Sequence, residues 1–237
     1  IPNILGVIYS GLRRYDEAVT SYNRTIELKP SYADAHNNLA NILKELDKYE
    51  EAIASYNKAI ELKPDYAEAY YNLGSIFYKL DKYEEAIQRF KKAISLKPNY
   101  ADALNTIGSH LLKIGKYQDA ISNLNKVVRL RVGFADAHNN LGASFYRLRD
   151  FENAIEHYTM LTQIDSSNSQ AFFNMGICFK DQELYESAIQ NFDKAIENNP
   201  NYPEAYNIKG MVLNGLGEYQ DAINNCEKAI KLRIDFH

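Results

Sequence analysis

The chain has 237 residues, of which 46% are hydrophobic and 24% charged, and a net charge of −4. These proportions are ordinary for a soluble protein. The small negative charge and the lack of a basic stripe argue against nucleic acid as a partner, because that binding needs Lys and Arg side chains to neutralise phosphates. No apolar run approaches the roughly 18 residues of a membrane span, so we expect no membrane insertion. We also see no targeting segment.

A period of 34 residues organises the sequence. Pro30, Pro64 and Pro98 are 34 residues apart, and Pro200 follows three periods later. When Ala67 is counted as position 1, position 17 is always aromatic, position 8 is glycine or alanine, and position 20 is always alanine. The alanines at position 20 are Ala18, Ala52, Ala86, Ala120, Ala154, Ala188 and Ala222. We therefore predict a single tandem array over residues 1–237.

Each repeat contains two predicted helices. In the third repeat Tyr70, Leu73 and Phe77 recur at helical spacing, a break follows near Asp81, and a second apolar series begins at Tyr83. In chain order the predicted repeats are residues 1–32, 33–66, 67–100, 101–134, 135–168, 169–202 and 203–236.

The junctions between repeats carry helix start and stop signals. Ser31 stands three residues before Asp34, and Asp65 stands three residues before Glu68, which predicts a capping box at the start of each first helix. The preceding proline ends the earlier helix. The fourth and fifth repeats lack this proline, with Val132 and Ser166 in its place, and we expect hinges at these two junctions.

The small residues predict where the two helices of a repeat cross. Gly74 and Ala86 lack bulk, so the helix axes can approach while Leu73 and Phe90 fill the space alongside. One helix pair cannot bury its own apolar face, and the next pair must complete the burial.

The period and these positions resemble the tetratricopeptide repeat family. The resemblance covers essentially the whole chain, although Tyr70 stands where the family usually has tryptophan at position 4. It implies an all-α fold, an α-solenoid in which antiparallel helix pairs stack into a right-handed superhelix with the first helices on the concave side. In the third repeat the residues that carry it are Tyr70, Leu73, Gly74, Phe77, Ala86, Phe90, Ala93 and Pro98.

No group of residues predicts catalysis, and we expect neither an enzyme, nor a cofactor, nor a metal site. His36 and His138 share a register but lie three repeats apart, so we interpret each as an aromatic residue at the core edge. His157 has no cysteine or carboxylate at ligand spacing. Cys226 occupies a core position, which favours a buried reduced thiol over a disulfide with Cys178 and indicates an intracellular, cytoplasmic setting.

Asparagine recurs at position 6, on the face of the first helices that packing should leave free. Asparagine in the middle of a helix costs roughly 0.5 kcal/mol or more relative to alanine. Its amide has both a donor and an acceptor, which match one peptide unit of an extended chain. Such a ladder would hold a partner's backbone, although duplication of an ancestral repeat would also repeat an asparagine. The ladder is Asn38, Asn72, Asn140 and Asn174, flanked by Asn37, Asn41, Asn105 and Asn139.

Other side chains on the same face would contact the side chains of a bound peptide. Position 2 is mostly acidic, as in Asp34 and Glu68, and forms a rim opposite a basic position 13. Signs of this kind also suit the helix dipoles. The resemblance points to similar asparagine rows in the superhelix of O-linked N-acetylglucosamine transferase, which grip extended peptides. The expected contacts are Tyr71, Tyr78, Tyr146 and Phe173, with Lys79, Lys113 and Arg147 on the basic rim.

Three functional hypotheses follow. The first is a non-catalytic adaptor that binds an extended protein segment in its groove. The second is an assembly scaffold whose terminal repeats, which have no polar capping helix, stack end to end. The third is the substrate-recruiting arm of a larger enzyme such as a glycosyltransferase. Family members that clamp a carboxylate terminus use Lys or Arg at positions 2, 5 and 6, where this chain has Asp34, Asn37 and Asn38, so that clamp is not expected.

Overall fold

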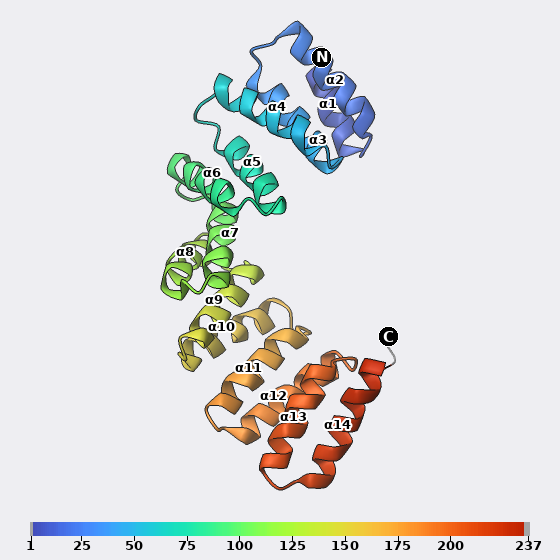
Figure 1. Ribbon diagram of the computed structural model, residues 1–237, viewed down its shortest axis with the longest axis vertical. Helices are drawn as coiled ribbons and strands as arrows, with labels where there is room; N and C mark the ends of the chain where they lie inside the picture. Colours follow the sequence, from blue (N-terminus) through green and yellow to red (C-terminus); the bar gives the residue numbers. More distant parts are fainter. Residues whose placement is uncertain (1, 235–237) are drawn as a thin grey trace. The chain divides into compact units, whose positions relative to one another are not determined.

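The computed structural model describes residues 2–234 (Figure 1). These residues fold into helices joined by short turns, two helices for each predicted repeat. Residue 1 and residues 235–237, which include the end of the seventh predicted repeat, lie outside the described part. The helices are α1 (Pro2–Gly11), α2 (Tyr15–Leu28), α3 (Ala33–Glu45), α4 (Tyr49–Leu62), α5 (Ala67–Lys79), α6 (Tyr83–Leu96), α7 (Ala101–Lys113), α8 (Tyr117–Leu130), α9 (Ala135–Arg147), α10 (Phe151–Ile164), α11 (Ser169–Asp181), α12 (Tyr185–Asn198), α13 (Pro203–Gly215) and α14 (Tyr219–Ile234).

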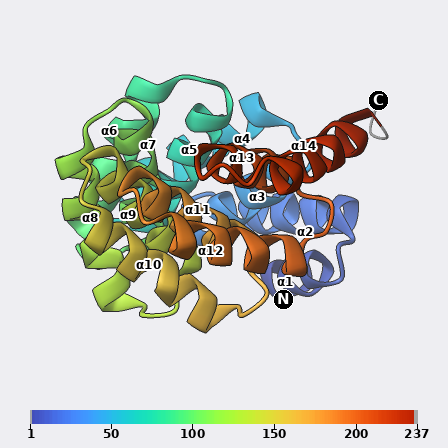
Figure 2. The ribbon, with the colours of Figure 1, turned by 90° about the horizontal axis from the view of Figure 1, so that it is seen from below.

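The helices form two compact units, residues 1–107 and 108–237, and the boundary lies inside α7. In the first unit α3 packs on α4, and α4 packs on α5 of the next repeat. In the second unit α9, α10, α11 and α12 follow one another in the same way and lie side by side in Figure 2. Each helix pair thus completes the burial of its neighbour, and the predicted α-solenoid is confirmed.

In the turn inside each repeat, the residue at position 15 has a left-handed backbone conformation, although the residue type differs between repeats. The backbone N–H of the following residue then donates to the carbonyl five residues back, as from Lys48 to Leu43 at 2.9 Å. This is the Schellman ending of a helix, which usually has glycine in the left-handed position. Five of the seven turns tolerate a larger residue there. The residues with positive φ are Arg13, Asp47, Asp81, Gly115, Arg149, Glu183 and Gly217.

The predicted capping boxes are wrong. The residues at the N-cap positions of α3 and α5 are Tyr32 and Tyr66, and neither helix receives a side-chain cap. Ser31 and Asp65 lie one residue too early, because the turn after the second helix takes up that position. A side-chain cap does occur in the sixth repeat, where Asn168 accepts a hydrogen bond from the N–H of Ala171 at 2.9 Å.

The junctions without proline keep the turn seen elsewhere. The N–H of Phe134 donates to the carbonyl of Arg131 at 3.1 Å, just as Tyr66 donates to Lys63 at 3.1 Å. The boundary between the two compact units does not fall at either predicted hinge. Flexibility at Val132 and Ser166 therefore stays a prediction.

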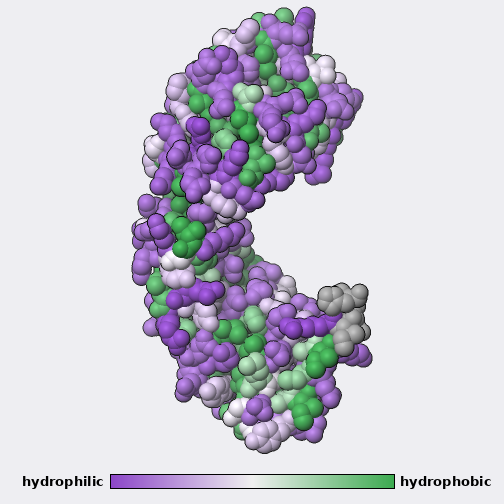
Figure 3. Space-filling view, viewed as in Figure 1, coloured by the Kyte–Doolittle hydropathy of each residue, from purple (hydrophilic) through white to green (hydrophobic). Residues whose placement is uncertain are grey.

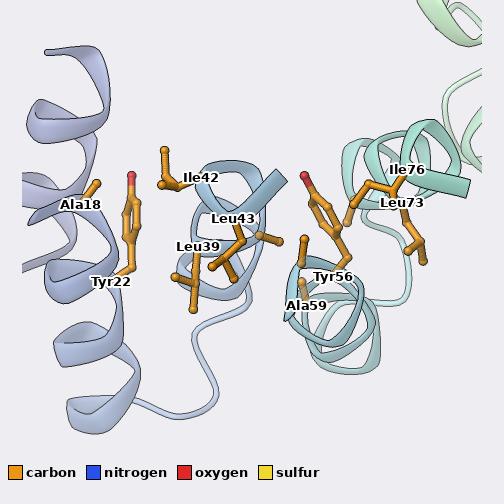
Figure 4. Packing of buried hydrophobic residues seen from close by; sticks show 12 residues of the cluster. Ala18, Tyr22, Leu39, Ile42, Leu43, Tyr56, Ala59, Leu73 and Ile76 are labelled. Carbon is orange, nitrogen blue, oxygen red and sulfur yellow. The ribbon is translucent and has the colours of Figure 1, made fainter. Parts of the chain in front are cut away.

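The core lies where the small residues predicted it. Ala52 is fully buried, and a Cβ added to Gly74 would meet the ring of Phe90 at 2.9 Å. In Figure 4 the rings of Tyr22 and Tyr56 occupy equivalent places one repeat apart, each against aliphatic side chains of the following repeat. The side chain at position 24, aromatic except for Leu124 and Cys226, thus fills the space that the small residue at position 8 leaves open.

A substitution of Ala52 tests this packing. Ala52→Leu adds bulk at the helix crossing and is expected to lower the free energy of unfolding by about 1–3 kcal/mol. Ala54→Leu, on the exposed face of the same helix, is the matched control. Urea denaturation followed by circular dichroism gives both values, and equal stability of the two variants would contradict the packing account.

Candidate functional site

The first helices of successive repeats contact one another in the first unit, α1 with α3 and α3 with α5. Their outward sides therefore form a continuous surface. We call this surface, and its counterpart on the first helices of the second unit, the first-helix face. It is defined by the side chains at positions 2, 5, 6, 9, 12 and 13 of each repeat.

One of the predicted ladder amides binds a flanking asparagine. The Nδ2 of Asn72 donates to the Oδ1 of Asn41 at 3.1 Å, and the hydroxyl of Tyr56 donates to the same oxygen at 2.5 Å. Burial raises the pKa of Tyr56, so this hydroxyl keeps its proton. Part of the asparagine pattern therefore links the first helices of adjacent repeats, a role that the sequence interpretation did not include.

The position-5 asparagines differ in exposure. Asn37 is only 3% exposed, and its Oδ1 has no hydrogen-bond partner. The Oδ1 of Asn105 is likewise buried and without a partner, whereas Asn139 is exposed. The prediction that Asn37 widens a solvated polar strip is therefore wrong, because its side chain is buried in the fold. Asn105 is half-buried, and its part in the strip stays a prediction.

The aromatic residues at position 5 show which side chains this position contacts. The ring of Tyr71 lies 5.5 Å from that of Phe90 and 4.9 Å from that of Tyr100, measured between centroids. Phe173 lies in the same way, 5.8 Å from Phe192 and 4.9 Å from Tyr202. Tyr71 and Phe173 are therefore half-buried members of aromatic clusters, and they reach the first-helix face with one edge.

The predicted basic rim is partly engaged. Lys79 donates to the carboxylate of Asp47 in the preceding repeat at 3.1 Å and lies 5.0 Å from the ring centre of Tyr49. Lys113 and Arg147 are exposed. Lys79 is thus directed across the repeat boundary.

The tyrosines at position 12 also contact neighbouring side chains. Tyr78 packs edge-on against Tyr83, with the ring centroids 5.1 Å apart. The hydroxyl of Tyr146 donates to Asp181 of the next repeat at 2.8 Å. Burial, and then this hydrogen bond, raise the pKa of Tyr146 to about 12. Both predicted contacts are half-buried and remain at the edge of the face.

The other ladder amides have more hydrogen-bonding capacity left. Asn38 and Asn140 are half-buried, and their amides make no hydrogen bond within the part of the chain that the structure describes. Asn174 accepts a hydrogen bond from Gln170 at 2.9 Å, which leaves its two N–H donors. Asn38 and Asn140 are the amides with the most capacity for an external peptide.

A row of aromatic residues at position 34 borders the same face and was not predicted as part of the site. The hydroxyl of Tyr202 donates to Gln170 at position 2 of its own repeat at 2.9 Å. Burial, the charge of Asp34 and a hydrogen bond to it raise the pKa of Tyr66. The sequence signal was present, because position 34 is aromatic in most repeats, but without the fold it marked only a repeat end.

A lysine, the two cysteines and two histidines also have defined surroundings. The amine of Lys209 donates to the carboxylate of Asp193 at 2.5 Å, and the lysine side chain is 17% exposed. Both cysteines are free, but Cys178 is the buried one and Cys226 is only half-buried. His138, expected at the core edge, is buried, and it also contacts His157, a contact that was not predicted.

Sequence profiles decide the family. Profiles described as "TPR repeat" match residues 12–47 and 40–81, and profiles described as "Tetratricopeptide repeat" match residues 67–100, 105–169, 169–202 and 191–224. The chain belongs to the tetratricopeptide repeat family. None of the curated protein sequences compared with the chain matches it.

Solved structures include several similar tetratricopeptide repeat proteins. YrrB, described as a TPR protein with an unusual peptide-binding site, is 28% identical over 79% of this chain and 97% of its own, with a TM-score of 0.73. MamA from Desulfovibrio magneticus RS-1 is 21% identical over 71% of this chain and 96% of its own, with a TM-score of 0.67. A tetratricopeptide repeat protein from Parabacteroides merdae ATCC 43184 is 14% identical over 98% of this chain and 91% of its own, with a TM-score of 0.67. The last two likenesses concern the fold alone.

Two searches of the described residues bear on other kinds of site. None of the helices examined is both long and apolar enough to cross a membrane. Among the same residues, no three His, Cys, Asp or Glu side chains cluster in a way that would hold a metal ion.

The two kinds of ladder asparagine predict different effects on stability. Asn72→Ala removes the hydrogen bond to Asn41, which is expected to lower the free energy of unfolding by about 1 kcal/mol. The higher helix propensity of alanine should offset roughly 0.5 kcal/mol of this loss. Asn140→Ala loses no such bond and should leave stability unchanged or slightly higher. Urea denaturation of both variants gives the comparison. An Asn140→Ala variant as destabilised as Asn72→Ala would show that Asn140 also has a structural partner.

Proposed function

We propose that this protein is an interaction module that binds extended peptide segments of partner proteins on its first-helix faces. The observation that carries the proposal is the state of Asn38 and Asn140. Each amide stands in mid-helix, half-buried and without a hydrogen bond among the described residues. A position that disfavours the helix and satisfies nothing inside the fold is best explained by a ligand outside it.

The chemistry of these amides fits the backbone of a peptide. One asparagine amide can donate to a peptide carbonyl and accept from a peptide N–H, whatever side chain the peptide carries at that point. Asn72 and Asn174 would contribute in part, because each already uses one of its groups inside the protein. Side chains of the peptide would meet the edges of Tyr71 in the first unit and of Phe173 in the second.

Charge at the face would then favour one orientation of the peptide. Asp136 and Arg147 are both exposed, at opposite ends of α9. Complementary charges mainly set specificity and association rate, so this contribution is expected to depend on salt. YrrB, for which a peptide-binding site is described, supports the choice of a peptide as the ligand.

In this proposal the module has neither catalytic activity nor a cofactor. The same surface would serve a recruiting arm of a larger enzyme, and nucleic acid is not among its expected partners. The two free thiols fit the intracellular, cytoplasmic setting that we propose for it.

Loss of the two amides tests the proposal. Peptides selected from an unbiased display library on the wild-type chain should bind the Asn38→Ala, Asn140→Ala double variant more weakly by about 1–3 kcal/mol, the cost of two hydrogen bonds. Isothermal titration calorimetry gives the affinities.

The matched control is the Asn57→Ala, Asn125→Ala double variant, which removes amides from the second helices α4 and α8. Equal affinity of every selected peptide for wild type and the ladder variant would remove the ladder from the binding site. Failure to select any peptide would contradict the function itself.

A second candidate function, end-to-end assembly, is favoured by two exposed apolar surfaces. On α1 the side chain of Ile8 is 50% exposed, whereas Ile42 and Ile76, at the same position in inner repeats, are 3% and 1% exposed. On α14 Ile223 is 50% exposed, against 8% for Ile121 at its position. Figure 3 shows hydrophobic surface in the region of α13 and α14.

The two surfaces use complementary positions. Inside the chain, position 10 of one repeat is buried against the second helix of the preceding repeat, where position 21 contributes to the contact. A groove of about 370 Å³ on the seventh repeat is lined by apolar side chains that include Met211, Ile223 and Cys226. We propose that α1 of a second copy occupies this groove, which would generate a head-to-tail contact.

Sedimentation velocity at rising concentration tests the assembly. Wild type is expected to shift toward larger species, and the Ile8→Lys and Ile223→Lys variants are expected to stay monomeric, because a buried unpaired charge opposes the contact. A wild-type protein that remains monomeric over the whole range would refute this candidate without affecting peptide binding.

A further inference from the structure

The fifth repeat, residues 135–168, contains a contact between two histidines that the proposed peptide site does not use. His138 on α9 is 4% exposed, and its Nδ1 lies 3.1 Å from the Nδ1 of His157 on α10. The Nε2 of His138 lies 2.9 Å from the carbonyl oxygen of Val132, at the junction that lacks proline. The ring of His157 stacks on Phe145, with centroids 5.6 Å apart.

Hydrogen-bond chemistry fixes the protons of this pair. A carbonyl oxygen only accepts, so the Nε2 of His138 must carry the proton that faces Val132. The Nδ1 of neutral His138 is then an acceptor, and the Nδ1 of His157 must be the donor. When both imidazoles are neutral, the Nε2 of His157 therefore carries no proton.

We propose that His138 and His157 make the fifth repeat an acid-sensitive element of the array. A proton added at the Nε2 of His157 places charge on a half-buried ring whose Nδ1 lies 3.1 Å from the buried His138. Acid therefore loosens α10 from α9.

The surroundings of the pair agree with this direction. Burial, and then the charge of His138, lower the pKa of His157 from its ordinary 6.5, and only Glu156 on the same helix opposes them. A lowered histidine pKa means that the fold prefers the neutral ring. The stability this gives is fully present above pH 6.5 and is lost as the pH falls through the folded pKa.

The neighbouring helices hold no anion against the pair. α11 packs on α10 through Met175, whose sulfur lies 3.5 Å from the hydroxyl of Thr159. Burial raises the pKa of Cys178 on the same helix to about 12, so its thiol is neutral. The carboxylate of Asp181 is engaged with Tyr146 and Lys180. On the side of α8, Arg131 lies over the ring of Phe134.

The chain carries its own control in the second repeat, residues 33–66. His36 occupies the position of His138, and its Nε2 lies 2.9 Å from the carbonyl oxygen of Pro30, the counterpart of Val132. The position of His157 is Ser55 in that repeat. The histidine-to-carbonyl bond is thus present twice, but the histidine pair only once.

The consequence for binding rests on the proposed function. α9 presents Asn139, Asn140 and Arg147, so a change in how α9 is held would reach the peptide. Regulation by acid would then act on the first-helix face of the second unit.

Amide hydrogen exchange measured by mass spectrometry tests the proposal on the whole chain, at about pH 7.5 and about pH 5, on either side of the ordinary histidine range. After correction for intrinsic rates, protection over residues 135–164 is expected to fall about two- to tenfold at the lower pH, the change that loss of one hydrogen bond produces. Protection over residues 33–62 should not change. His157→Ser, which copies the residue of the second repeat, should make the protection over residues 135–164 as insensitive to pH as that over residues 33–62.

His157→Asn, which copies the residue at this position in the fourth, sixth and seventh repeats, provides a second variant should the serine variant fold poorly. Nitrogen-15 spectra of the imidazoles add an independent readout, because wild type should show a proton on Nδ1 of His157 and on Nε2 of His138 near neutral pH. The opposite tautomers, or an equal loss of protection in both repeats, would overturn the proposal. Peptide affinity at the two pH values tests the link to binding separately: unchanged affinity with altered exchange would refute only that link.

Discussion

The close approach of the two helices within each repeat is the constraint on which the rest of the structure depends. A glycine or alanine at position 8 and an alanine at position 20 let the backbones meet, and the side chain at position 24, an aromatic ring in five of the seven repeats, fills the space beside them. A Cβ added to Gly142 would lie 2.6 Å from the ring of Tyr158, which shows how little room remains. The repeated small residues thus set the distance between the helices, and this distance determines which side chains can reach the first-helix face.

That face combines two uses of polar residues. Some asparagines satisfy each other inside the protein, as Asn72 and Asn41 do, and thereby tie neighbouring repeats together. Others, Asn38 and Asn140, make no hydrogen bond among the described residues, and we propose that they contact a bound peptide. One residue type at one position thus has a structural role in one repeat and is available for recognition in another, depending on the residue opposite. Asn72 faces Asn41, whereas the residue that occupies position 9 before Asn38 is Val7, whose side chain offers no acceptor.

The histidines at position 4 likewise have different surroundings in different repeats. His36 and His138 both tie a first helix to the carbonyl of the preceding junction. Only His138 meets a second histidine, because the residue at position 23 differs between the two repeats. In our proposal, this single difference in an otherwise repeated setting gives one repeat a response to pH that its neighbours lack.

The sequence by itself determined the period, the number and order of the helices, and the residues at the helix crossings, because each of these depends on spacing along the chain. It also predicts that Asn38 and Asn140 bind a peptide, and this stays a prediction. Only the tertiary structure decided which asparagines were already satisfied, that Asn37 was buried, that Lys209 was paired with Asp193, and that His138 met His157. These facts depend on which side chains of different helices come within hydrogen-bond distance, and that distance is fixed by how the helices pack. Spacing along the chain cannot supply it, since identical positions in two repeats face different neighbours.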